Sequence, residues 1–260
     1  MAIFLTWNVY HGTFQNGPYP SPSDRIARIV ALGMQQFVDV ICLQEVPRSI
    51  LDPAVPLGTP GALTPIVQSL DATVAGWSTF YNAVQVYSEN NPNGNNWVTT
   101  TDGYLVLHRP ATFPNIANLG YTQPGAFVDL IGNSLRPPVQ LDLSTMAGTV
   151  VTVLDWHADT GGPQVAIALS ALDHVLGQAN GRPNRTIVLG DLNYPGPVEN
   201  SVPNHPFPGW EDLSVRIDRR VNGVDHVLSS ETTTIALTGK LNFKSDANHY
   251  PIAVNMAVAP

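Results

Sequence analysis

The chain of 260 residues carries 12 Lys+Arg and 20 Asp+Glu, which gives a formal net charge of −8. Only 12% of its residues are charged and 43% are hydrophobic, a composition that argues against a disordered chain or a coiled coil. The acidic balance also argues against a protein that coats nucleic acid by bulk attraction, so any phosphate site must be local. No repeat or composition break marks a boundary, and a single domain over residues 1–260 is expected.

A β-α-β unit is predicted at the start of the chain. Ala2–Val9 and Val38–Leu43 are apolar segments that favour strands, and the second is apolar enough for a strand buried on both faces. Between them, Ser23 or Asp24 is expected to cap a helix whose apolar residues recur at helical spacing. Cys42 is the only cysteine, which excludes an intramolecular disulfide and a cysteine-based zinc site.

The rest of the chain alternates apolar segments with turns. Strands are predicted at Phe80–Tyr87, Tyr104–His108, Val139–Leu143, Val150–Trp156, Thr186–Leu189, Val224–Leu228 and Ile252–Met256. A further helix is expected between Pro163 and Gly181, while Asn90–Asn96 and Tyr194–Pro208 are rich in Asn, Pro and Gly and predict loops. Many strands with few helices favour two packed sheets flanked by helices, which is an α/β sandwich.

Polar side chains recur where the predicted strands begin or end, at the rim that packed sheets leave open. They are Asn8, Gln44, Glu45, His157, Asp191, Asn193, Asp225 and His249. Asp191 and Asn193 flank Leu192, so both are expected to point to the same face of an extended segment. So many polar groups at strand ends indicate a functional site.

Six segments in a fixed order resemble the endonuclease/exonuclease/phosphatase superfamily, which has the deoxyribonuclease I fold. They are Thr6-Trp7-Asn8, Leu43-Gln44-Glu45-Val46, Trp156-His157-Ala158, Gly190-Asp191-Leu192-Asn193, Val224-Asp225-His226-Val227 and His249-Tyr250-Pro251-Ile252. Within the superfamily, Leu135–Val139 and His157–Gly162 look most like the catalytic subunit of cytolethal distending toxins, and Ser88-Glu89 and Tyr104–Arg109 look like deoxyribonuclease I. The resemblance implies a four-layer α/β sandwich of two packed mixed β-sheets flanked by helices.

Hydrolysis of a phosphodiester needs a divalent cation, an activated water and a proton for the leaving oxygen. Mg²⁺, or Mn²⁺ or Ca²⁺ in its place, binds carboxylate and carbonyl oxygens, so Glu45 and the neighbouring Asn8 are the expected metal ligands. Asp191 is expected to orient or deprotonate the water. The Asn193 amide is expected to donate to the phosphate oxygens, and the family analogy assigns these two residues the same work.

His157 and His249 are the expected proton-transfer groups, because imidazole titrates near physiological pH. The resemblance pairs His249 with Asp225 and His157 with Glu89. A carboxylate on the far ring nitrogen fixes the tautomer and stabilises the imidazolium.

The last motif departs from the family pattern, which reads Ser-Asp-His-x-Pro. This chain reads Ser245-Asp246-Ala247-Asn248-His249-Tyr250-Pro251. Either two residues are inserted after Ser-Asp, or Asn248 replaces the aspartate beside the histidine. Asp246 and Asn248 are therefore alternative candidates for a further metal ligand.

Arg109 and Arg136 match positions where the family places arginines against substrate phosphates, a contact that suits the bidentate guanidinium. Together these residues predict a metal-dependent phosphodiesterase with DNA as the favoured substrate. A phosphoinositide phosphatase or sphingomyelinase acting on a phospholipid head group is the alternative, since Trp97 and Trp210 could dip into a membrane interface. A binding protein with a degenerate site is a third reading.

No apolar run approaches the roughly 18 residues of a membrane span, so stable membrane insertion is not expected. The toxin resemblance implies secretion, with Met1 in place of a removed signal peptide, and possible delivery subunits. A natural start at Met1 would instead fit a cytoplasmic protein.

Overall fold

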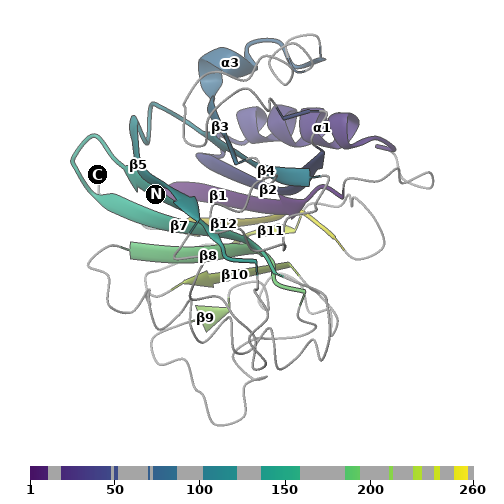
Figure 1. Cartoon of the computed structure of the whole chain (residues 1–260). Helices are drawn as coiled ribbons and strands as arrows, with labels where there is room; N and C mark the ends of the chain where they lie inside the picture. The colour runs from purple at the N-terminus through teal and green to yellow at the C-terminus, as the bar shows by residue number, and fades with distance from the viewer. Residues whose placement is uncertain are drawn as a thin grey trace, which may run out of the picture.

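Two six-stranded sheets pack face to face in the computed structural model of the chain (Figure 1). The structure describes residues 1–10, 19–47, 50–51, 70, 73–86, 102–121, 136–158, 185–193, 211–212, 225–229, 237–240 and 249–256. Helices α1 (Pro22–Gln35) and α3 (Trp77–Phe80) cover the outer face of the first sheet. The predicted sandwich of two mixed sheets with helices is confirmed. The helix expected between Pro163 and Gly181 lies outside the described residues.

The first sheet has the strand order β11-β12-β1-β2-β4-β3. Its members are β1 (Ala2–Asn8), β2 (Val40–Pro47), β3 (Asn82–Val86), β4 (Asp102–His108), β11 (Leu237–Lys240) and β12 (Ile252–Met256). Only β1 and β2 are parallel neighbours among these described strands.

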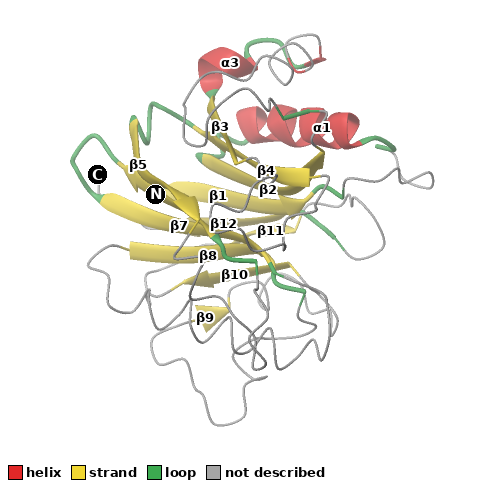
Figure 2. Cartoon of the chain, in the orientation of Figure 1, coloured by secondary structure: helices red, strands yellow, loops and turns green. Residues whose placement is uncertain are grey.

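The second sheet has the order β5-β6-β7-β8-β10-β9. Its members are β5 (Asn115–Tyr121), β6 (Val139–Ser144), β7 (Val150–His157), β8 (Arg185–Asp191), β9 (Glu211–Asp212) and β10 (Asp225–Ser229). Here β7 and β8 form the parallel pair. Every strand that the sequence predicts is present, and β5, β9, β11 and α3 are the additions (Figure 2). Their segments are short or interrupted by polar residues and glycine, so they lack a clear apolar pattern.

Helix α1 begins earlier than its sequence pattern suggested. Ser21 is the N-cap, its hydroxyl accepts from the Asp24 amide at 3.1 Å, and the Asp24 carboxylate accepts from the Ser21 amide at 3.3 Å. The predicted cap at Ser23 or Asp24 is therefore wrong. Pro22 fits the first turn of a helix because its φ is already fixed there, so the helix starts at Pro22. Among the described residues, no helix is long and apolar enough to span a membrane.

Side-chain alternation along the strands carries polar residues to one edge of the space between the sheets. In β1, Phe4 lies in the core between the sheets, so Thr6 and Asn8 face the same way. In β8, Leu189 lies in that core and Asp191 follows two residues later. Because parallel strands end at the same edge of a sheet, the last residues of β1, β2, β7 and β8 come together. The strand ends thus build the candidate site.

Candidate active site

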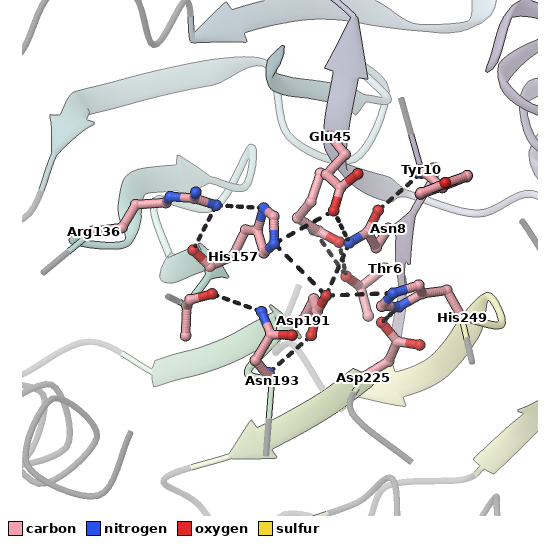
Figure 3. A network of polar contacts seen from close by, with 12 residues as sticks. Thr6, Asn8, Tyr10, Glu45, Arg136, His157, Asp191, Asn193, Asp225 and His249 are labelled. Atoms are coloured by element: carbon pink, nitrogen blue, oxygen red, sulfur yellow. Dashed lines mark hydrogen bonds and ion pairs between the residues drawn. The ribbon is translucent and has the colours of Figure 1, made fainter. Parts of the chain in front are cut away.

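The carboxylate of Asp191, at the end of β8, is the centre of a polar network (Figure 3). Its Oδ2 accepts from Asn8 Nδ2 at 2.9 Å and lies 3.8 Å from Nε2 of His157 and 3.6 Å from Nε2 of His249. Burial raises the pKa of Asp191 to about 6, although His249 nearby and the hydrogen bond from Asn8 act in the opposite direction. A bound cation would oppose this rise in the pKa of Asp191, because its positive charge favours the ionised carboxylate.

Glu45 reaches the network from a bulge in β2. The register between β2 and β4 shifts between Leu43 and Val46, and Glu45 has a φ of 52°, which is uncommon outside glycine. The Glu45 Oε1 atom accepts from Asn8 Nδ2 at 3.0 Å and lies 3.5 Å from Nε2 of His157. Such strain is often found at functional sites, and here it directs the carboxylate toward Asn8 and His157.

Asn8 holds the two carboxylates together. Its Nδ2 donates to both Glu45 and Asp191, while its Oδ1 accepts from the backbone N–H of Tyr10 at 2.8 Å. The amide is thereby oriented with its donor toward the carboxylates. The metal-ligand role expected for Asn8 stays a prediction.

The donor set fits a hard divalent cation. One ligand atom each from Glu45, His157 and Asp191 lies within 4.8 Å of the others, and Asp191, Asp225 and His249 form a second such group. Two carboxylates that converge in a mostly buried place repel each other unless a positive charge lies between them, and Mg²⁺ prefers such oxygens. Glu45 and Asp191 are the residues best placed to hold the ion. The predicted candidates Asp246 and Asn248 lie outside the described residues.

His249 packs against Asp225, the partner that the resemblance assigns to it. The two atoms Nδ1 of His249 and Oδ1 of Asp225 are 3.0 Å apart, and the Tyr250 amide donates to the other carboxylate oxygen at 3.2 Å. With Nδ1–H donating to Asp225, Nε2 of the ring faces Asp191. His249 is therefore oriented for proton transfer at Nε2.

The Nδ1 atom of His157 contacts the guanidinium of Arg136, whereas Nδ1 of His249 contacts a carboxylate. Nη1 of Arg136 lies 2.5 Å from His157 Nδ1 and 3.3 Å from the His157 carbonyl oxygen. A guanidinium has only donors, so Nδ1 accepts this hydrogen bond and the ring hydrogen is on Nε2, facing Glu45 and Asp191. Arg136 thus lies at the site but contacts His157. Glu89, the partner that the resemblance assigns to His157, lies outside the described residues.

The segment after β8 turns instead of continuing as a strand. Asn193 has a φ of 50°, its backbone N–H donates to Asp191 Oδ1 at 2.8 Å, and its Nδ2 donates to the Ala158 carbonyl at 2.7 Å. The expected shared strand face of Asp191 and Asn193 is therefore wrong, because the backbone is left-handed at Asn193. Gly190, at φ 136°, has no space for a side chain, since a Cβ would overlap the Trp156 carbonyl.

Arg109 lies at the opposite edge of the first sheet. It follows the end of β4, which pairs with the start of β2 at Val40, whereas Glu45 is near the end of β2. Its Nη1 donates to Asp39 Oδ1 at 3.0 Å. The predicted phosphate contact of Arg109 is wrong, because β4 runs antiparallel to β2 and carries its last residues away from the site.

A buried polar chain behind the site joins Gln44, which the sequence indicated as a strand-end residue, to Asp155, which it did not. Gln44 Nε2 donates to Thr6 Oγ1 at 3.1 Å and, across the sheets, to Asp155 Oδ1 at 2.5 Å. Asp155 is fully buried, and this burial raises its pKa to about 8 despite the hydrogen bond from Gln44. The available signal was an acidic residue inside the apolar segment Val150–Trp156.

The sequence matches the model of a known protein family. A model of the Endonuclease/Exonuclease/phosphatase family matches residues 5–246. The chain belongs to this family. Membership of this family supports the activity of a phosphoester hydrolase. The narrower resemblance to the catalytic subunit of cytolethal distending toxins is not shown.

Similar solved structures share the fold at low sequence identity. A truncated TDP2 from Caenorhabditis elegans has a TM-score of 0.60 at 14% identity, with 98% of both chains covered. A mannosyl-6-phosphatase from Bacteroides thetaiotaomicron VPI-5482 has a TM-score of 0.62 at 14% identity, with 99% of this chain and 100% of that chain covered. The human Nocturnin catalytic domain with bound sulfate has 0.55 at 13%, with 98% and 93% covered. The comparison with curated protein sequences gives no match.

Proposed function

We propose that this family member is a divalent-metal-dependent phosphodiesterase that cleaves DNA. The observation that carries the proposal is the convergence of Glu45, Asp191, His157 and His249 at the edge between the sheets. In this arrangement Asp191 Oδ2 lies within 3.8 Å of both imidazole Nε2 atoms. A carboxylate pair for a cation and an imidazole backed by a carboxylate are the parts that water attack on a phosphodiester requires.

In the proposed reaction, the water oxygen forms a bond to phosphorus and the bond from phosphorus to the leaving oxygen breaks. Asp191 Oδ2 accepts the proton of the water, and protonated His249 gives a proton from Nε2 to the leaving oxygen. These two atoms are 3.6 Å apart, so the proton returns from Asp191 to His249 after each turnover through one water or after a small movement of the side chains. Asp225 stabilises the imidazolium of His249. Glu45, beside Asp191, would hold a cation, and this cation would neutralise phosphate charge.

His157 has a different part in this reaction. Its Nδ1 accepts from Arg136, so its Nε2 carries the hydrogen and, with substrate bound, donates to a non-bridging phosphate oxygen. Hydrogen bonds of this kind stabilise the charge that develops in the transition state. The site thus combines one proton-transfer histidine with one hydrogen-bond donor histidine.

The position of exposed apolar residues supports a substrate in solution over a membrane lipid. Within the described part of the chain, the large exposed hydrophobic residues are Met1, Phe37 and Met146. They precede β1, β2 and β7, whereas the site lies at the other ends of these strands. The described surface near the site therefore offers no apolar anchor for a bilayer, and the candidate interface residues Trp97 and Trp210 lie outside the described residues.

The substrate assignment is tested by initial rates on supercoiled plasmid DNA and on phosphoinositide or sphingomyelin vesicles at equal enzyme and Mg²⁺. We expect DNA nicking with a shallow salt dependence, because an acidic chain neutralises few phosphates. Asp191→Asn, purified in the same way, is the control for contaminating nuclease. Lipid turnover without nicking would overturn the choice of DNA.

Metal removal should abolish the activity. EDTA should stop cleavage, and excess Mg²⁺ or Mn²⁺ should restore it, because the convergent carboxylates need a cation. Glu45→Gln should raise the metal concentration for half-maximal rate by at least about tenfold. Asp24→Asn removes an exposed carboxylate from α1 and serves as the matched control, whose metal requirement should stay at the wild-type level. Full activity in EDTA would show that no metal is used.

A further inference from the structure

Arg25 is a fully buried arginine on α1, a charged side chain in a place where charge is costly. Among the described residues, its guanidinium donates to three backbone carbonyl oxygens. Nη1 contacts the oxygens of Tyr19 and Pro20 at 3.0 Å each, and Nη2 contacts the oxygen of Tyr10 at 2.6 Å. One guanidinium therefore joins the chain directly after β1 to the chain directly before α1.

Tyr10 connects this guanidinium to the site. Its backbone has a φ of 55°, a left-handed conformation that is uncommon for a residue with a side chain. The carbonyl of Tyr10 accepts from Arg25, and the N–H of the same residue donates to Asn8 Oδ1 at 2.8 Å. The hydrogen bond from Arg25 can thus stabilise the backbone conformation that presents this N–H to Asn8.

The orientation of the Asn8 amide determines how the two carboxylates are held. With Oδ1 on the Tyr10 N–H, Nδ2 donates to Glu45 at 3.0 Å and to Asp191 at 2.9 Å. A rotation of the amide by half a turn would place its oxygen against two carboxylates and lose these donors. The Tyr10 N–H opposes that rotation, because an amide oxygen can accept it and an NH₂ group cannot.

We infer that Arg25 is a positioning residue of the active site, which acts through the Tyr10 backbone to orient the Asn8 amide and so to set the spacing of Glu45 and Asp191. The contacts run from Arg25 on α1, which lies on the outer face of the first sheet (Figure 1), through Tyr10 to Asn8 at the edge between the sheets, and Figure 3 shows the contact between Tyr10 and Asn8. The consequence for metal binding rests on the proposed function. The contacts of Arg25, Tyr10 and Asn8 do not depend on it.

The test compares wild type with Arg25→Gln, Arg25→Lys and Arg28→Gln. Mn²⁺ affinity is measured by calorimetric titration, and exchange of the Tyr10 backbone amide and the Asn8 side-chain amide is measured by NMR. Arg25→Gln should weaken Mn²⁺ binding by about tenfold or more, the usual range for residues that orient metal ligands, and should speed exchange at both amides. The Mn²⁺ affinity and the amide exchange rates of Arg25→Lys should fall between those of wild type and Arg25→Gln, since an ammonium donates without the planar geometry of guanidinium.

Arg28→Gln is the matched control on the same helix. Arg28 lies with its guanidinium 5.8 Å from the centre of the Tyr19 ring, and its substitution removes the same charge. Its Mn²⁺ affinity and both amide exchange rates should match wild type. A general effect of lost positive charge would instead appear in both Gln variants and would overturn the assignment to Arg25.

The outcomes separate a positioning role from a merely structural one. If Arg25→Gln lowers the melting temperature but leaves Mn²⁺ affinity and amide exchange unchanged, Arg25 is only structural and the inference is wrong. If Arg25→Gln does not fold, Arg25→Lys decides by the same measurements. If wild type binds no Mn²⁺, the metal part of the proposed function fails, and the exchange rates of Tyr10 and Asn8 still decide whether Arg25 orients the amide.

Discussion

His249→Ala should lower the rate of phosphodiester cleavage by about 10²–10⁴-fold, the usual contribution of a positioned proton-transfer group. The structure places Nε2 of this residue 3.6 Å from Asp191 and its Nδ1 3.0 Å from Asp225. Removal of the imidazole leaves Asp191 without the group to which it returns its proton. Initial rates at saturating Mg²⁺ measure the loss, and circular dichroism checks that the fold is intact.

Variants of the contacting residues sharpen this test. Asp225→Asn should lose much of the same activity, because an amide does not stabilise the imidazolium as a carboxylate does. His157→Ala should also be strongly impaired, through loss of a hydrogen bond to the phosphate rather than loss of proton transfer. His108→Gln is the matched histidine control, since His108 contacts the Phe113 carbonyl at the far end of β4. A folded His249→Ala protein with wild-type rate would remove His249 from the mechanism.

The sequence predicts which strand-end residues face the space between the sheets, because the alternation of side chains along a strand is a local property. Once Phe4 and Leu189 are placed in a core, Asn8 and Asp191 must lie on the same faces, and apolar strands identify that core. The same reasoning brings His157 to the edge of β7. The amino-acid pattern of the strands is therefore sufficient to propose these strand-end residues.

Strand direction and side-chain partners depend on contacts that are distant in the sequence. Arg109 lies at the edge of the sheet opposite the site because β4 is antiparallel to β2. The segment Tyr104–Arg109 alone does not encode this strand direction. Arg136 contacts Nδ1 of His157, where the resemblance places the carboxylate of Glu89. The left-handed φ at Asn193 arises where β8 ends in a hydrogen-bonded turn. Each of these needs the three-dimensional arrangement.

Asp155 was missed for the same reason, since its partner Gln44 is 111 positions away in the sequence. Asp155 is buried between the sheets, and its Oδ2 has no hydrogen-bond partner among the described residues. Burial raises its pKa from 3.8 to about 8. Between these values the folded protein holds a proton that the unfolded chain has released, so stability falls as pH rises.

Asp155→Asn should remove this loss of stability at alkaline pH. An asparagine oxygen can accept from Gln44 Nε2 as the acid does, and it has no proton to lose. Wild type loses up to about 1.4 kcal/mol of unfolding free energy per pH unit across this window through Asp155. The variant should therefore be close to wild type near pH 4 and clearly more stable at pH 9. Urea unfolding at pH 4, 6.5 and 9, compared as differences between the two proteins, measures the effect.

Asp142→Asn is the matched control for this experiment, because it removes a buried carboxylate from the neighbouring strand β6. The Asp142 Oδ1 atom accepts from Thr152 Oγ1 at 2.7 Å and from Gln140 Nε2 at 3.3 Å, whereas Asp155 Oδ2 has no hydrogen-bond partner among the described residues. This variant should gain no stability at pH 9. A stability difference between Asp155→Asn and wild type that stays constant from pH 4 to 9 would contradict the prediction, because only a proton held by the folded state makes the difference grow with pH.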